Sequence, residues 1–234
     1  MNKTEPILIA CEESGIVTEE FIKLGFTNVF SCDLMETSGN YPDHHICGDV
    51  IPLINGNCCF TTSDGVDHEI KTRFSLIIAF PPCTYLSNAG AARLYPQKGV
   101  LNQERYEKGL KAKDFFMLFY NADCPKIAIE NPVSSKVFCL PAHNQEIQPW
   151  QFGHPYMKKT RLWLKGLPNL EPTEVVKENL ISWVSGGSKD NKGNKRKQTG
   201  TKIRDSKTRS KTFQGIAEAM AIQWAGRCDL IEKN

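Results

Sequence analysis

Long apolar runs are missing from this sequence, and no stretch reaches the roughly 18 apolar residues that a membrane-spanning helix needs. A basic segment followed by an apolar one, which marks a secretory leader, is also missing. The nine cysteines are odd in number and lack the paired two-residue spacing of a zinc site, so neither a disulfide framework nor a metal site is indicated. We therefore expect a cytoplasmic protein with reduced thiols and no bound metal.

Two short segments still contain residue types that bind metals, His44-His45-Ile46-Cys47 and Cys58-Cys59. Their spacing fits buried small residues and a turn better than it fits a set of metal ligands. The length of 234 residues, with 40% hydrophobic and 24% charged residues, is typical of one soluble globular domain.

The net charge of +3 conceals a strongly basic segment. Residues 188–211 contain ten basic and two acidic residues, whereas the rest of the chain contains 19 basic and 24 acidic residues. A basic segment on an acidic remainder is typical of a protein that binds a polyanion, and a solvated loop without a partner is the alternative. Because residues 185–210 are rich in glycine and lysine and have no apolar periodicity, we expect them to be flexible until a polyanion orders them.

The first part of the chain is typical of a βαβ unit. Residues 6–10 form an apolar run that predicts a strand, and apolar residues recur at helical spacing over residues 17–24. A second predicted strand, residues 28–32, ends at Asp33. The distance of 18 residues from Gly15 to Asp33 is close to the spacing at which an acidic residue binds a ribose in nucleotide-binding units. A single glycine is less than a full glycine-rich fingerprint, so this spacing alone leaves the cofactor open.

The sequence Phe80-Pro81-Pro82-Cys83 directly follows the apolar run 75–79. Neither proline can donate to a strand ladder, so the two prolines end the predicted strand and place Cys83 just beyond its carboxyl end. Open α/β sheets bind their ligands at that edge, which makes the thiol a candidate nucleophile. A buried, inert cysteine is the alternative.

A second candidate group follows another predicted strand. Residues 126–129 form a buried apolar run, and Glu130 comes directly after it. If the sheet is parallel, Asp33, Cys83 and Glu130 converge on one cleft, because the carboxyl ends of parallel strands share one edge. Taken alone, Glu130 would also suit the cap of a following helix.

The remaining segments complete an α/β pattern. Residues 46–50 predict a third short strand that contains Asp49, and residues 55–71 predict an exposed insertion. Residues 158–164 alternate like a strand, which places Arg161 on the face opposite Leu162, pointing either to solvent or into the cleft. Two helices complete the pattern, at residues 101–121 and at residues 213–224, where the apolar stripe is expected to pack on the sheet.

This series of motifs resembles that of DNA cytosine-5 methyltransferases, above all the short, stand-alone members carried by phages. The resemblance runs from about Ile7 to Trp224 through Cys11 to Gly15, Asp33, Asp49, Pro81-Pro82-Cys83, Glu130-Asn131-Pro132, Lys159-Thr160-Arg161 and Gly215-Ile216-Ala217. It implies a Rossmann-like, S-adenosylmethionine-dependent methyltransferase fold of the α/β class, with a mostly parallel sheet and helices on both faces. It also implies a single catalytic domain over residues 1–234, in which residues 165–211 form a short basic segment for target recognition and DNA contact.

The resemblance assigns roles to individual residues. The catalytic residues it implies are Cys83, which adds to carbon 6 of a flipped cytosine, Glu130, which holds the base, and Arg161, which supports the base and the thiolate. The residues it implies for binding S-adenosyl-L-methionine are Cys11, Glu12, Ser14, Gly15, Asp33, Leu34, Asp49, Val50 and Pro81. Together with the basic segment, it implies DNA contacts by Ser87, Asn88, Lys159, Lys195, Arg196, Lys197, Lys202, Arg204 and Arg209.

Some features of the sequence depart from the family. The loop from Cys11 to Gly15 lacks the usual phenylalanine and paired glycines, which allows a variant of the cofactor. The group expected to be transferred is therefore a methyl or a related group. Thr84 stands where glutamine is common, and the target-recognition segment is short, which predicts weak sequence specificity. The alternatives are a catalytically silent nucleic-acid-binding protein and the same chemistry on RNA or on a free nucleotide.

Overall fold

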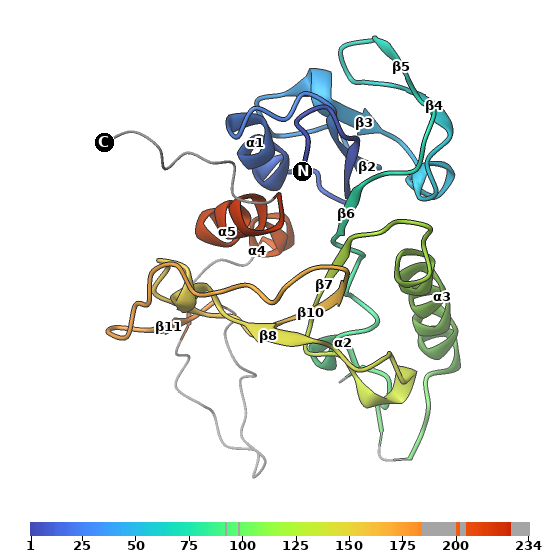
Figure 1. The fold of residues 1–234 in the computed structure, drawn as a ribbon. Helices are drawn as coiled ribbons and strands as arrows, with labels where there is room; N and C mark the ends of the chain where they lie inside the picture. The colour runs from blue at the N-terminus through green and yellow to red at the C-terminus, as the bar shows by residue number, and fades with distance from the viewer. Residues whose placement is uncertain (92, 98, 184–199, 202–204, 226–234) are drawn as a thin grey trace.

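The computed structural model describes residues 1–234 except for 92, 98, 184–199, 202–204 and 226–234. A seven-stranded sheet lies at its centre (Figure 1). Its strands are β1 (Ile7–Ala10), β2 (Val29–Asp33), β3 (His45–Cys47), β6 (Leu76–Ala79), β7 (Ile127–Pro132), β8 (Gln145–Ile147) and β10 (Thr160–Lys165). The described helices are α1 (Ile16–Lys23), α2 (Asn88–Ala91), α3 (Gln103–Tyr120), α4 (Ser206–Ser210) and α5 (Gln214–Trp224). Two smaller sheets pair β4 (Cys58–Thr61) with β5 (Asp67–Ile70) and β9 (Tyr156–Met157) with β11 (Ile181–Ser182).

The strand order of the central sheet is β3-β2-β1-β6-β7-β10-β8. The first five strands in this order are parallel, and β10 is antiparallel to both of its neighbours. The chain runs outward from β1 through β2 to β3 and then returns to place β6 on the other side of β1. The carboxyl ends of β1 and β6 therefore flank a topological switch point, which is where open α/β sheets bind their ligands.

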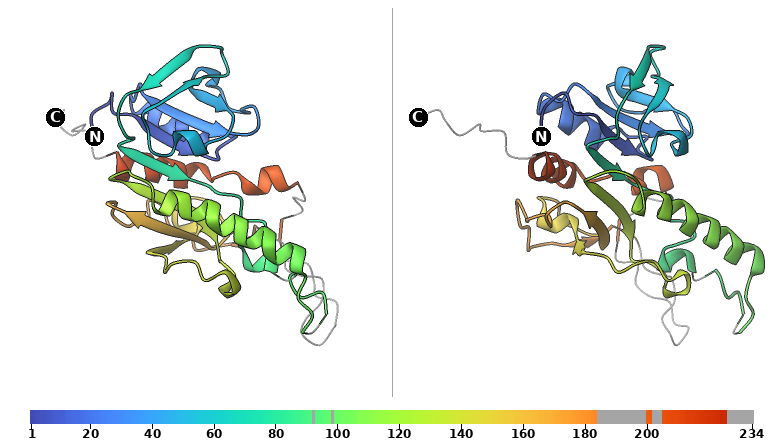
Figure 2. Two further views of the ribbon diagram at one scale, coloured as in Figure 1. Left: turned by 90° about the vertical axis from the view of Figure 1, so that its right-hand side faces the viewer. Right: turned by 45° about the vertical axis from the view of Figure 1, so that its right-hand side comes forward.

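Helices cover both faces of this sheet, as Figures 1 and 2 show. Alternate residues of β1 point to opposite faces, so Leu8 packs in the core with Phe116 of α3, whereas Ile9 packs with Phe21 of α1 and Met220 of α5. All five of these side chains are fully buried, and each burial stabilises the fold by roughly 1.5–3 kcal/mol. The predicted α/β fold class, a mostly parallel, Rossmann-like sheet with helices on both faces, is confirmed.

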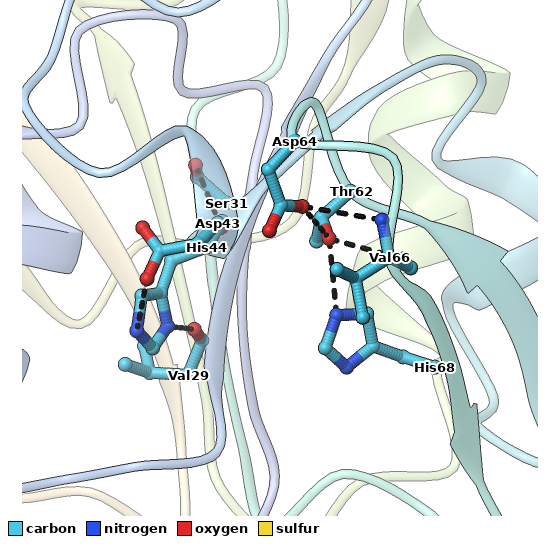
Figure 3. Close-up of polar contacts among 8 residues, drawn as sticks. All are labelled: Val29, Ser31, Asp43, His44, Thr62, Asp64, Val66 and His68. Carbon is cyan, nitrogen blue, oxygen red and sulfur yellow. Dashed lines mark hydrogen bonds and ion pairs between the residues drawn. The ribbon is translucent and has the colours of Figure 1, made fainter.

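The predicted insertion at residues 55–71 contains the antiparallel hairpin β4–β5. Its turn is organised by Thr62, whose hydroxyl donates to Asp64 Oδ1 at 2.6 Å and lies 3.0 Å from His68 Nε2 (Figure 3). The hairpin packs on β2 through Phe30, whose ring lies 4.9 Å from those of Phe60 and His68. The insertion is therefore attached to the sheet by an aromatic cluster.

The described residues also bear on the cysteines and on membrane-spanning segments. All eight cysteines among them are free thiols, in line with the prediction of reduced cysteines. Within the same part of the chain, no helix combines the length and the apolar character needed to cross a membrane.

Candidate functional site

The loop after β1 begins the site. Cys11 and Gly15 both have a positive φ, of 59° and 66°, and Gly15 is the N-cap of α1. Between them, the buried Glu12 carboxylate accepts hydrogen bonds from the Val17 N–H at 2.6 Å and from the Thr18 N–H and hydroxyl at 3.3 and 2.7 Å. An acidic side chain thus occupies the first turn of α1, the position at which nucleotide-binding folds hold a phosphate.

Two aspartates lie beside this loop. Asp33 ends β2 and Asp49 follows β3, and each accepts a hydrogen bond through Oδ1 at 3.0 Å from the backbone N–H two residues later. A backbone hydrogen bond joins the ends of β2 and β3, because the Gly48 N–H donates to the Asp33 carbonyl at 2.8 Å. Burial raises the pKa of the Cys11 thiol, and the negative charges of Asp33 and Asp49 raise it further. Both carboxylates therefore lie close enough to the loop after β1 to act on its thiol.

Apolar side chains lie beside both aspartates. Leu34 is 78% exposed and Ile51 is 48% exposed, although both are large apolar residues. Val50, in contrast, is buried in the core, and Pro81 is also buried. Exposed apolar groups next to acidic groups form a surface suited to a flat ring attached to a sugar.

The loop after β6 carries Cys83, which is partly buried. Its backbone carbonyl accepts hydrogen bonds from the N–H groups of Leu86 and Ser87, at 3.2 and 3.0 Å. The Arg105 guanidinium on α3 also stabilises this loop, because it donates hydrogen bonds to the carbonyls of Thr84 and Gly90, each at 3.1 Å. The position of the thiol is thus fixed by backbone contacts at both ends of a tight loop.

Glu130 lies on β7, the strand next to β6. It lines a small cavity together with Phe80, Lys158, Thr160, Ser210, Thr212, Phe213, Ile216 and Met220. Burial raises the pKa of the Glu130 carboxyl, while the Lys158 charge and a hydrogen bond with Thr160 oppose that rise. A raised pKa favours a neutral carboxyl group that can donate a hydrogen bond.

The thiol and the carboxyl group act on each other. Burial raises the pKa of the Cys83 thiol, and the Glu130 charge raises it further. The positive charges of Lys158 and Arg209 act in the opposite direction, toward a lower pKa. Cys83, Glu130, Lys158 and Arg209 are therefore one electrostatic cluster at the carboxyl edge of β6 and β7, as predicted for the first two of these residues.

The structure does not bring Arg161 into this cluster. In the register of β10 with β7, Leu162 pairs with Glu130, and Arg161 pairs with Asn131. Trp163 lies in the core on the α3 face of the sheet and Leu162 in the core on the α5 face, so strand alternation turns Arg161 away from Glu130. Its Nε lies 3.8 Å from Glu146 Oε2 on β8.

Lys158 is the site residue that sequence reasoning missed. Its ammonium group donates to the Arg209 carbonyl at 3.3 Å and lies 5.8 Å from the centre of the Phe213 ring. The alternation of residues 158–164 contained the signal, because Lys158, Thr160 and Leu162 share one face. Only the register with Glu130 shows that this is the face of the cluster.

The residues predicted to contact DNA lie in several environments. Lys195, Arg196, Lys197, Lys202 and Arg204 lie outside the described residues. Arg209, on α4, is held near the thiol because its carbonyl also accepts a hydrogen bond from the Trp183 indole at 3.3 Å. Lys159 forms an ion pair with Glu146 at 2.9 Å, and Ser87 is buried. Asn88 is exposed, and its backbone N–H donates a hydrogen bond to the Val133 carbonyl at 2.9 Å.

No group of three or more His, Cys, Asp or Glu side chains in the described part of the chain could hold a metal ion. Near the loop after β1, the partly buried Asp33 and the exposed Asp49 make this part of the site acidic. Their carboxylates would repel the phosphates of a dinucleotide and attract a cationic group.

No family model matches the chain, and no curated protein sequence matches it. Among solved structures, the chain is similar to a crystal structure described as that of a candidate DNA modification methyltransferase encoded within a prophage of E. coli. The two share 11% identity with a TM-score of 0.42, over 74% of this chain and 52% of the other, so this chain spans about half the length of that protein. The fold assignment rests on the strand order described above.

Proposed function

We propose that this protein transfers a methyl group from S-adenosyl-L-methionine to carbon 5 of cytosine in DNA, through a covalent bond between Cys83 and carbon 6 of the base. The observation that carries the proposal is the shared site of the Cys83 thiol and the Glu130 carboxyl at the carboxyl ends of two adjacent parallel strands. A thiol nucleophile and a neutral carboxylic acid are the two groups that addition to a cytosine ring requires.

The residues at the switch point fit S-adenosyl-L-methionine. Its sulfonium and amino groups are positive, which suits the acidic surroundings of Asp33 and Asp49. Asp33 would hold the ribose hydroxyls, and the exposed Leu34 and Ile51 would lie against the adenine. Gly39 packs closely against the loop after β1, because a Cβ at this position would lie 2.9 Å from the Ser14 carbonyl oxygen. When bound, the cofactor supplies an electrophilic methyl group.

The protein groups then act in order. Cys83 attacks carbon 6 as a thiolate, and the pair of electrons from the C5–C6 double bond moves through the ring to N3. Glu130 in its neutral form donates its proton to N3, which makes carbon 5 electron-rich. After carbon 5 gains the methyl group, its proton passes to a solvent base, and the C–H electron pair restores the C5–C6 double bond and expels the Cys83 thiolate. N3 then returns its proton to the Glu130 carboxylate. Lys158 stabilises the thiolate, in the place first assigned to Arg161.

The target base has to leave the DNA helix to reach this site. Cys83 and Glu130 lie at the sheet edge, and Glu130 lines a small cavity. A base stacked within a duplex exposes neither carbon 6 nor N3 to two protein groups together, so the cytosine is flipped out at a cost of about a few kcal/mol. Because the cavity is small and Ser210 and Thr212 line it, we expect the end of α4 and the residues after it to shift when a base enters.

The experiment that tests this function uses a duplex containing 5-fluorocytosine together with S-adenosyl-L-methionine. Fluorine does not leave carbon 5 as a proton does, so we expect a covalent protein–DNA adduct that survives denaturation and maps to the Cys83 peptide. Cys83→Ala removes the adduct, and the matched control Cys59→Ala, which changes an exposed thiol on the β4–β5 hairpin, retains it. An adduct that persists in Cys83→Ala, or no adduct with any cytosine duplex, contradicts the proposal.

Product analysis identifies the transferred group. Nucleosides from the DNA of cells that express the protein are analysed by mass spectrometry, beside cells that express Cys83→Ala. We expect 5-methylcytosine in the first sample alone. A heavier 5-substituted cytosine would retain the thiol mechanism and replace the methyl group with a larger one.

A further inference from the structure

A groove beside Cys83 is not used by the chemistry described above. It lies between the loop after β6 and the middle of α3, with a volume of about 430 Å³. The residues that line it are Pro82, Thr84, Tyr85, Lys108, Lys111, Ala112 and Phe115. Pro82 and Thr84 are the direct neighbours of Cys83, so the groove lies along the loop that carries the thiol, although Cys83 itself does not line it.

The walls of this groove are held in place before any ligand binds. The Arg105 guanidinium lies 4.9 Å from the centre of the Tyr85 ring while it bonds to the Thr84 and Gly90 carbonyls. A Cβ on Gly90 would lie 2.0 Å from the Thr84 carbonyl oxygen, so these two parts of the loop are in close contact. Phe115 packs against the core on the α3 face. The aromatic walls therefore require little reordering on binding.

The charge of the groove is positive. Lys111 is exposed and makes no ion pair within the described residues. Lys108 is also exposed and is paired with Glu104, one turn earlier on α3. Aromatic side chains combined with unpaired cations are the two elements of sites that hold unstacked nucleic acid, in which bases stack on rings and phosphates bind to lysines.

We propose that this groove binds the strand that carries the target cytosine, with a neighbouring base against Tyr85 and Phe115 and its phosphate on Lys111. The proposal rests on the proposed function, because it takes Cys83 as the point at which the flipped base enters. A strand that delivers its base to Cys83 must pass over Pro82 and Thr84, and the groove begins there. The groove thus adds a second DNA contact to that of the basic segment, on the opposite side of the thiol loop from Lys158 and Arg209.

Equilibrium binding of fluorescein-labelled DNA across a range of salt concentrations tests the role of Lys111. We expect Lys111→Glu to weaken binding by about tenfold and to reduce the slope of log affinity against log salt by about one. Lys113→Glu is the matched control, because it makes the same charge change on α3 at a residue that does not line the groove, and its affinity should stay within about twofold of the unmodified protein. Equal losses in the two variants overturn the proposal.

Photo-crosslinking locates the strand. A duplex with 5-iododeoxyuridine next to the target cytosine is irradiated with the protein, and the crosslinked peptide is identified by mass spectrometry. A crosslink to Tyr85 or Phe115 supports the proposal, and crosslinks confined to other segments overturn it. Binding of radiolabelled S-adenosyl-L-methionine that Lys111→Glu abolishes, with DNA affinity unchanged, also overturns it, because the groove then serves the cofactor. If the 5-fluorocytosine adduct is absent while DNA binding depends on Lys111, the proposed function fails and the groove assignment stands.

Discussion

Replacement of Glu12 by glutamine should change how the stability of this protein depends on pH. The Glu12 carboxylate is 4% exposed and lies against the first turn of α1, where Val17 and Thr18 donate to it. Burial raises the pKa of Glu12 to about 7, even though these hydrogen bonds favour the ionised form. The carboxyl group is therefore less acidic in the folded state than in the unfolded chain.

The size and sign of the effect follow from this difference. Below pH 4.5 the carboxyl group is protonated in both states, and the folded protein carries no penalty from it. As the pH rises from 4.5 to about 7, the unfolded chain loses the proton while the folded protein keeps it, so the free energy of unfolding falls. A pKa of about 7 instead of 4.5 corresponds to about 3 kcal/mol at full effect, and the loss is complete above pH 7.

Glu12→Gln has no charge to lose and therefore lacks this part of the pH dependence. The variant also loses an acceptor for Thr18, which lowers its stability by about 1–2 kcal/mol at every pH. Urea unfolding, followed by circular dichroism between pH 4.5 and 8, measures both the pH-dependent and the pH-independent change in the free energy of unfolding. We expect the stability advantage of the unmodified protein over Glu12→Gln to shrink, and then to reverse, as the pH rises.

The control for this experiment is Glu178→Gln, which neutralises an exposed carboxylate. Its stability should run parallel to that of the unmodified protein across the range. Parallel curves for Glu12→Gln as well would refute the reasoning, because they would show that burial does not change the acidity of Glu12.

Two further predictions concern the cluster and the core. Lys158→Gln should raise the pKa of the Cys83 thiol and slow its alkylation by iodoacetamide at pH 7.5 several-fold, as measured by mass spectrometry of the Cys83 peptide. Lys159→Gln, which alters a lysine paired with Glu146, should leave the alkylation rate unchanged. Equal rates in the two variants would contradict the role of Lys158. Gly109→Ala should lower the free energy of unfolding by about 1–3 kcal/mol in thermal melts, because its Cβ would lie 2.1 Å from the Phe138 ring, although alanine normally stabilises a helix. Gly48→Ala, with no atom within 4 Å of its Cβ, should change stability by less than about 0.5 kcal/mol, and a stabilised Gly109→Ala would show that the ring moves freely.

The placement of Cys83 and Glu130 could be predicted from the sequence because it depends on local signals. Two apolar runs predict buried strands, and the structure has them as β6 and β7. The proline pair ends the first run, whereas the second strand continues through Glu130 to Pro132. Since parallel strands end at one edge, the convergence of the two side chains follows from the sheet type alone.

The roles of Lys158 and Arg161 depend on information that is not local. Lys158 precedes β10, and alternation along β10 separates Arg161 from Thr160 and Leu162 but does not say which face holds Glu130. That is decided by the register of β10 with β7, and this register depends on packing across the whole sheet. The β4–β5 hairpin could not be predicted either, because its strands are short, half of their residues are polar, and only Cys58 and Ile70 within them are buried.

The arrangement of Cys83, Glu130 and Lys158 allows one proton to serve two purposes. An ionised Glu130 would hold the thiol in its unreactive form, since its charge raises the pKa of Cys83. A neutral Glu130 removes that charge and at the same time carries the proton that N3 of cytosine has to receive. Burial raises the pKa of both groups and Lys158 lowers the pKa of both, so the reactive state requires burial to dominate at Glu130 and the Lys158 charge to offset burial at Cys83. The enclosure of Glu130 by α5 and the segment after α4 is therefore part of the chemistry, because an exposed carboxylate in its place would ionise and suppress the nucleophile.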